Sequence, residues 1–259
     1  MKYIYSYRFL FESPNWLMNL LAAVVCQFVP ILGQMVLAGY AFEIIEALHR
    51  RKGSPYPDFD MNQLMKYLTR GVWPFLVQLV VGLPFAVIIM IGYVGCLGVG
   101  FALGGANDHP AVLFLFLMLF YLLVFVLSVL VTFVMMPLTL RAGLIQDFKP
   151  AFSVDFAKDF INRMWLEMVL LEMFLLGTGI VLSMVGMLAC GVGLYPAAAL
   201  MAYAHYHLLY QVYELYLERG GMPIPLKPEP AAAQGADLAA EAPPPSAPPS
   251  EGFKAPDQP

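Results

Sequence analysis

Five polar side chains stand within otherwise apolar stretches of this chain and are the first candidates for chemistry: Glu43, Gln78, Glu172, His205 and His207. Glu43, Gln78 and Glu172 each lie seven to nine residues from an arginine at the edge of an apolar stretch. On a helix this spacing corresponds to roughly 10–14 Å. A carboxylate near an imidazole at such a depth in a membrane is typical of a proton- or ion-responsive site.

A second interpretation of the same five residues is structural. Polar side chains inside membranes also form hydrogen bonds between neighbouring helices, each worth about 0.6–2 kcal/mol. His205 and His207 are two residues apart, which places them about 200° apart around a helix, so they cannot bind one ligand together. We therefore expect no metal site and keep both interpretations of the cluster open.

Other kinds of chemistry have no sequence support. The chain contains no GxSxG, HExxH or GxxxxGK[ST] pattern, so we expect neither an enzyme nor a bound cofactor. Cys26, Cys96 and Cys190 are far apart and lack CxxC or Cys/His spacing, which argues against a disulfide framework and a zinc site.

The elements that must position these residues are membrane helices. Of the 259 residues, 60% are hydrophobic and only 12% are charged, whereas a soluble domain has roughly 25% charged residues. Long uncharged runs separated by short clusters of charge predict an all-α polytopic bundle. We predict about six transmembrane helices in three hairpins, at about 15–49, 72–140 and 164–218.

Breaks within the apolar runs define these hairpins. Pro30 and Gly33 predict a turn between helices at 15–29 and 33–49, and "CGVGLYP" predicts one at 190–196. A third turn is expected at 104–110, within "GGANDHP". The first helix is only about 22 Å long, so it either crosses a thinned bilayer or re-enters without crossing.

Basic residues orient the hairpins. Lysines and arginines cluster in the segments 50–70 and 141–163 and after the last helix, whereas the turns at 104–110 and 190–196 contain none. Since cytoplasmic segments carry the Lys/Arg excess, both termini are expected on the cytoplasmic side of the membrane.

The second and third hairpins look like copies of one another. Phe59 precedes Arg70 by eleven residues, and Phe152 precedes Arg163 by the same number. Each hairpin is led in by an amphipathic segment, which predicts a short interfacial helix. Asp60 and Ser153 are the expected N-caps of these segments.

The C-terminal segment has a different composition. We divide the chain into a bundle at 1–221 and a tail at 222–259, which holds 11 of the 21 prolines. Such a tail cannot bury enough apolar surface to fold, so we expect it to be disordered. It is either a docking ligand for another protein or an inert linker.

Several short motifs point to a family. "FLFESPNW", the Gly39–Tyr40 pair, "GSPYPDFD" and "KPAFSVDFAKDFINRMW" together resemble the domain-of-unknown-function 4013 family of prokaryotic integral-membrane proteins. The likeness covers roughly residues 5 to 215, and Phe59 stands where the family pattern has tryptophan. The resemblance implies a multi-pass protein of a prokaryotic cytoplasmic (inner) membrane and brings no activity with it.

These observations favour a non-enzymatic accessory, scaffold or lipid-organising protein. Its expected partners are membrane lipid and an unidentified protein that contacts the cytoplasmic loops or the Pro-rich tail, with no nucleic acid. The alternative is a small transporter or channel. It would use the five polar residues named above, which are expected in the cytoplasmic half of the bilayer.

Overall fold

A computed structural model describes residues 1–51, 56–104 and 110–227, and within them the only regular structure is helical. The chain divides into two units, Met1–Pro225 and Leu226–Pro259, and all the described helices belong to the first. Residues 105–109 of the predicted second turn and residues 228–259 of the predicted tail lie outside the described residues.

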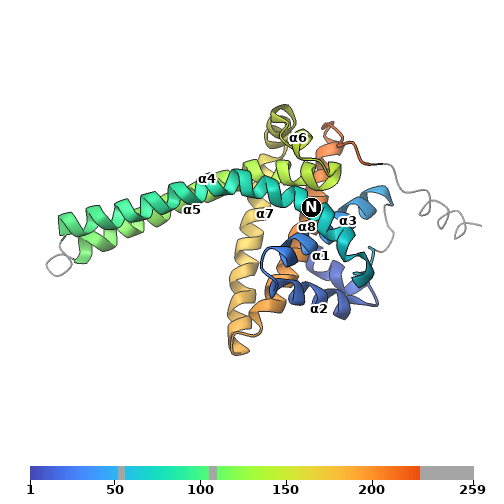
Figure 1. Ribbon diagram of the computed structural model, residues 1–259, viewed down its shortest axis with the longest axis horizontal. Helices are drawn as coiled ribbons and strands as arrows, with labels where there is room; N and C mark the ends of the chain where they lie inside the picture. The colour runs from blue at the N-terminus through green and yellow to red at the C-terminus, as the bar shows by residue number, and fades with distance from the viewer. Residues whose placement is uncertain (52–55, 105–109, 228–259) are drawn as a thin grey trace, which may run out of the picture. The chain divides into compact units, whose positions relative to one another are not determined.

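The helices follow one another with short connections (Figure 1). Their bounds are α1 Tyr3–Arg8, η1 Phe9–Glu12, α2 Trp16–Gln27, α3 Leu32–Arg50, η2 Met61–Gln63, α4 Leu64–Gly104, α5 Pro110–Ile145, α6 Phe148–Ala151, α7 Val154–Leu188 and α8 Leu194–Glu218.

Local sequence signals explain where several helices begin and end. The turn after α2 contains Pro30 and Ile31, whose φ is 65°, and the turn after α7 contains Cys190 and Gly191 with φ of 53° and 80°. The Asp60 carboxylate accepts from the Asn62 amide at 2.9 Å, and the Ser153 hydroxyl accepts from a backbone amide in the first turn of α7. Both predicted N-caps are therefore confirmed.

The predicted interfacial helices are not separate elements. The segments expected to lie on the membrane surface are instead continuous with the apolar helices that follow, as the first turns of α4 and α7. The change from amphipathic to apolar sequence marks a change of surroundings and not the end of a helix. Pro74 lies near this boundary in α4, and the helix continues through it.

The described residues include three helical segments that are long and apolar enough to cross a membrane: Met61–Ala102, Phe114–Ile145 and Phe148–Leu188. A fourth is possible if Tyr3–Glu12 and Trp16–Gln27, bent by 106°, count as one span. The described residues thus fit an all-α protein with apolar helices suited to a membrane, while six full crossings remain a prediction.

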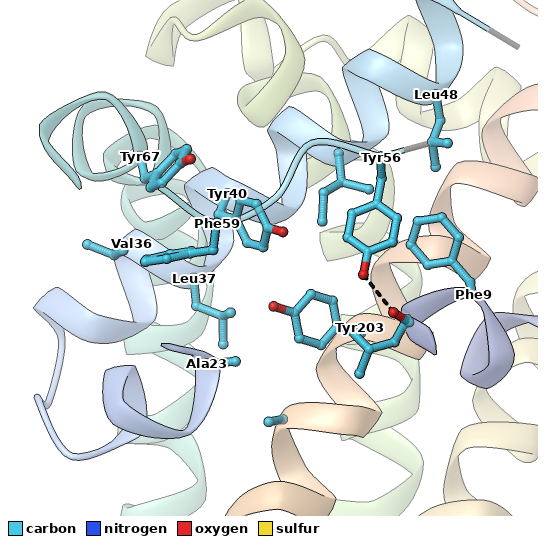
Figure 2. Packing of buried hydrophobic residues seen from close by; sticks show 13 residues of the cluster. Phe9, Ala23, Val36, Leu37, Tyr40, Leu48, Tyr56, Phe59, Tyr67 and Tyr203 are labelled. Atoms are coloured by element: carbon cyan, nitrogen blue, oxygen red, sulfur yellow. Dashed lines mark hydrogen bonds between the residues drawn. The ribbon is translucent and has the colours of Figure 1, made fainter. Parts of the chain in front are cut away.

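The buried core gathers around α3, which packs against α2, α4, α5 and α8. Aromatic rings from distant segments meet there (Figure 2). Tyr40 of α3 contacts the rings of Phe59, Tyr67 and Tyr203 at centroid distances of 5.1, 5.4 and 6.2 Å. Tilted and edge-on ring pairs of this kind add to the energy of apolar burial.

Two glycines let α3 and α4 touch backbone to backbone. A Cβ on Gly39 would lie 1.8 Å from the Tyr67 carbonyl oxygen, and one on Gly71 would lie 1.7 Å from that of Met35. No larger residue fits either position without separating the helices. The Gly39–Tyr40 pair thus combines a close helix crossing with the central ring of the core.

This crossing yields a stability prediction. Gly71→Ala should lower the melting temperature of the purified protein in detergent, because overpacking costs about 1–3 kcal/mol and each kcal/mol corresponds to about 2–4 °C at this size. Gly82→Ala on the same helix is the control, since a Cβ there has nothing within 4 Å. Alanine is the better helix former, so this control should keep or raise the melting temperature. Equal melting temperatures for the two variants would contradict the crossing.

Candidate functional site

A carboxylate in the segment after α3 forms the most highly connected polar site among the described residues. Asp58 accepts hydrogen bonds from the Ser13 hydroxyl at 2.5 Å, the Asn15 amide at 2.7 Å and the Asn19 amide at 2.9 Å. Burial alone would raise the pKa of Asp58, but these three bonds outweigh it and hold the pKa below its ordinary value of 3.8. Asp58 is therefore an ionised tether between this segment and the start of α2.

Neighbouring residues fasten the same segment along its length. The Tyr56 hydroxyl donates to the Leu10 carbonyl at 2.7 Å, the bond drawn in Figure 2. The Tyr40 hydroxyl donates to the Pro57 carbonyl at 2.9 Å. Segment 56–60 is thus held by η1 on one side and by α3 on the other.

Asn19 extends this network to the last helix. Its side-chain oxygen accepts from the Phe59 amide at 2.9 Å, and its backbone carbonyl accepts from the Tyr203 hydroxyl of α8 at 2.8 Å. Asn19 is fully buried, and every polar group named here has a partner within the chain. We call Ser13, Asn15, Asn19, Tyr56 and Asp58 the Asp58 network.

A second polar site joins α3, α4 and α5. Arg70 is only 5% exposed, and its guanidinium contacts the Glu46 carboxylate at 2.5 Å and donates to the Gly143 carbonyl at 3.1 Å. The other oxygen of Glu46 accepts from Arg50 at 2.8 Å. A buried charge of this kind is tolerated because it is paired and hydrogen-bonded.

The third polar site joins the first half of α7 to the C-terminal end of α8. Arg163 donates to the Arg219 carbonyl and Arg219 donates to the Arg163 carbonyl, each at 2.6 Å. Arg219 also forms an ion pair with Glu167. Arg70 and Arg163, equivalent in the predicted repeat, therefore both donate to a carbonyl at the far end of the paired helix.

The five candidate residues occupy different surroundings. Glu43 forms an ion pair with Lys66 at 2.6 Å, and its other oxygen is buried without a hydrogen-bond partner. Gln78 is exposed on α4, and Glu172 is half-buried on α7. In the described parts of the chain, neither side chain has a hydrogen-bonding or ionic partner.

The two histidines also differ. His207 is 5% exposed, stacks on Phe9 at a centroid distance of 4.3 Å and lies 3.1 Å from the Gln211 amide nitrogen. His205 is half-buried beside Tyr206. No hydrogen bond, ion pair or ring contact joins any two of the five candidates within the described residues. Their joint action remains a prediction.

Metal-binding side chains do not gather around these residues in the part of the chain that the structure describes. No group of three or more His, Cys, Asp or Glu residues there could hold a metal ion. One apolar cavity of 430 Å³ has none of the five candidates in its wall. It is lined by Tyr7, Gly177, Thr178, Val181, Leu182 and Leu200.

Fold and site together define a class of protein: an all-α chain with apolar helices suited to membrane insertion, held together by buried polar tethers. Residues 22–191 match the family described as "Protein of unknown function (DUF4013)", and the chain belongs to this family. No curated protein and no solved structure matches the chain.

Sequence reasoning identified the motifs of the Asp58 network without predicting that they meet. "FLFESPNW" contains Ser13 and Asn15, and "GSPYPDFD" contains Asp58. Both served only to suggest the family. Their shared signal is that each places small polar residues beside aromatic ones at the edge of an apolar run.

The Asp58 network gives a prediction with a pH dependence. Asp58→Asn should destabilise the protein by about 1–3 kcal/mol. The amide NH2 that replaces one carboxylate oxygen is a donor, and it would face side chains that now donate to Asp58. In the parent, the stability from ionised Asp58 is fully present above pH 3.8 and is lost as pH falls through the lowered pKa. Denaturant unfolding at several pH values measures both effects. Asp147→Asn is the control, because Asp147 is exposed and its side chain makes no capping hydrogen bond; equal losses in the two variants would contradict the tether.

The Arg70 site gives a second prediction. Arg70→Ala should cost about 3–5 kcal/mol, because it removes a buried guanidinium that pairs with Glu46 and donates to the Gly143 carbonyl. Arg163→Ala should cost less, since the Arg163 side chain is 39% exposed and its carboxylate partner reaches solvent. Thermal unfolding of the two variants checks this order, and a larger loss for Arg163→Ala would reverse the assignment.

Proposed function

We propose that this protein is a non-enzymatic, multi-pass component of a prokaryotic cytoplasmic membrane, with both termini in the cytoplasm. It acts as an accessory, scaffold or lipid-organising protein. Of the three hairpins predicted from the sequence, α4–α5 is the pair whose length and composition best support two full crossings.

One observation carries the proposal: the polar groups with the most partners in the core are bound by other groups of the same chain. Asp58 is satisfied by three donors from the chain, and Arg70 is held by Glu46 and Gly143. Groups that serve catalysis or transport must instead exchange partners with a substrate, an ion or water. A core built from closed pairs supports a structural role.

Exposed apolar side chains at the start of α4 and α7 offer contact surfaces for that role. Met61 and Met65 are 65% and 73% exposed, and Val154 is 62% exposed. Methionine adapts its shape to different partners. These helix starts fit contact with lipid or with a partner protein at the membrane surface.

A transporter or channel is the second candidate. It is favoured by Glu172, a half-buried carboxylate with no hydrogen-bonding partner among the described residues, and by the unpaired oxygen of Glu43. A carboxylate in an apolar helix without a partner is a common feature of proton pathways.

A proton-flux assay separates these functions. The protein is reconstituted into vesicles that enclose a pH-sensitive dye, and a pH gradient is imposed together with a potassium diffusion potential. We expect the parent and Glu172→Gln to leak protons no faster than empty vesicles. A leak in the parent that Glu172→Gln abolishes, while Met173→Leu on the neighbouring exposed position retains it, would replace the structural role with transport.

A further inference from the structure

Three helices of this protein have apolar parts that are too short to cross a bilayer. α2 has 12 residues, and α3 has eleven from Leu32 to Phe42 before its first charge at Glu43. α8 has eleven from Leu194 to Ala204 before a more polar stretch, which begins at His205 and contains His207, Gln211 and Glu214. At 1.5 Å per residue these parts measure about 16–18 Å, whereas the hydrocarbon core of a bilayer is about 30 Å thick.

The short apolar parts end at the same level on one side. Phe28, just after α2, stacks on Tyr195 in the first turn of α8 at a centroid distance of 4.5 Å. The Gln27 amide donates to the Tyr195 carbonyl at 3.0 Å. The α2–α3 turn and the start of α8 therefore share one end, which we call the apolar tip.

They also end at the same level on the other side. The Tyr203 hydroxyl donates to the Asn19 carbonyl near the start of α2, and the ring of Tyr203 faces Tyr40 of α3. Asn19 and Asp58 are joined by a hydrogen bond of 2.9 Å. The Asp58 network thus lies opposite the apolar tip, about one short helix away.

The Asp58 network includes and adjoins solvent-exposed polar groups. Its member Asn15 and the nearby Glu12 are exposed, and Asp58 itself is ionised and only partly covered. Moving charges of this kind into hydrocarbon costs about 2.5–3.5 kcal/mol each on insertion scales. This end of the three helices therefore belongs at the headgroup level.

The tip has the opposite character. The sequence from Ser13 to Phe42 contains no charged residue, and neither does that from Met173 to Tyr213. A turn that reaches water is normally polar, and the sequence between α4 and α5 has this composition, with Asn107, Asp108 and His109. The large apolar side chains exposed at the tip are Phe28 61%, Val29 46%, Ile31 58%, Leu32 53%, Met187 65%, Leu188 85% and Val192 70%.

We propose that α2, the first half of α3, the end of α7 and the first half of α8 form a wedge that enters one leaflet and turns back inside the bilayer. The partner of its tip is the acyl-chain region of that leaflet, and only α4 and α5 cross completely. In this arrangement the helix predicted at 15–29 re-enters the membrane and does not cross it. The number of full crossings is then two, where the sequence predicts about six. It does not depend on the accessory role proposed above.

The composition of α7, taken alone, suggests that this helix extends further through the bilayer than α2, α3 and α8 do. Its exposed apolar surface continues past the level of the Asp58 network through Leu166, Leu170 and Met173. Its depth is nevertheless fixed by its contacts with α8, because Gly186 and Gly193 touch at the tip and Gly179 packs on Met201. α7 and α8 therefore reach the same depth.

Single cysteines test the wedge. Cys26, Cys96 and Cys190 are replaced by alanine, and one cysteine is returned at Ile31 or Val192 in the tip. Asn107→Cys in the α4–α5 turn and Glu12→Cys beside the Asp58 network are the two surface controls. Each variant is treated with a membrane-impermeant maleimide in right-side-out and in inside-out membrane vesicles, before and after addition of detergent.

We expect Asn107→Cys and Glu12→Cys to react from opposite sides of the membrane. Ile31→Cys and Val192→Cys should react from neither side until detergent is added. Reaction of Ile31→Cys from the Asn107 side would show a full crossing, and reaction from the Glu12 side would place the tip outside the lipid. Either result overturns the wedge.

A depth measurement excludes protection by protein contacts. A bimane fluorophore on Ile31→Cys should be quenched several-fold more by lipid with a nitroxide at carbon 12 of the acyl chain than by lipid with a headgroup nitroxide. Stronger headgroup quenching, or no quenching by either lipid, would overturn the proposal. If these variants fail to fold, the Cys26→Ala/Cys96→Ala protein keeps native Cys190 in the α7–α8 turn and carries the same test.

Discussion

The hydrogen bonds to Asp58 are the constraint on which the rest of the structure depends. A carboxylate held by a hydroxyl and two amides is stable where it is ionised and close to water, and it is costly in hydrocarbon. Because its partners lie at and just before the start of α2, the same bonds fix where that helix begins relative to the membrane surface. The length of α2 then sets how deep the apolar tip can reach.

The helix contacts around α3 connect this local tether to α4 and α5. Gly39 and Gly71 bring α3 and α4 into backbone contact, and Arg70 ties both helices to α5 through Gly143. Each contact restricts movement between the helices that it joins, and a transporter domain would need such movement. These contacts support the structural role that we propose for the protein.

Local features of the fold could be predicted from the sequence, and long-range contacts could not. The turn at Pro30, the break near Cys190 and the caps at Asp60 and Ser153 follow from properties of a few neighbouring residues. The Asp58 network joins residues about forty positions apart. Serine, asparagine and aspartate each suit a turn on local grounds, so nothing in their spacing indicates that they bind one another.

The candidate site illustrates the same limit. The sequence singles out the five polar residues by their position in apolar runs. That position indicates their depth in the membrane but not the direction in which each side chain points around its helix. His207 therefore faces Phe9 and Gln211, while Gln78 faces outward on α4. The polar groups that organise the core lie at the ends of the apolar runs. A charged residue is common at such a position, and its partner comes from another segment, so the sequence does not single it out.

A double-mutant cycle between Asp58 and Asn19 tests the central claim most directly. The free energy of unfolding is measured for the parent, Asp58→Ala, Asn19→Ala and the double variant. The account predicts that the two losses are coupled by about 0.5–3 kcal/mol, as for residues in one hydrogen-bond network. Losses that add to within about 0.3–0.5 kcal/mol would mean that the two residues act independently, and would contradict the tether between the α3–α4 segment and α2.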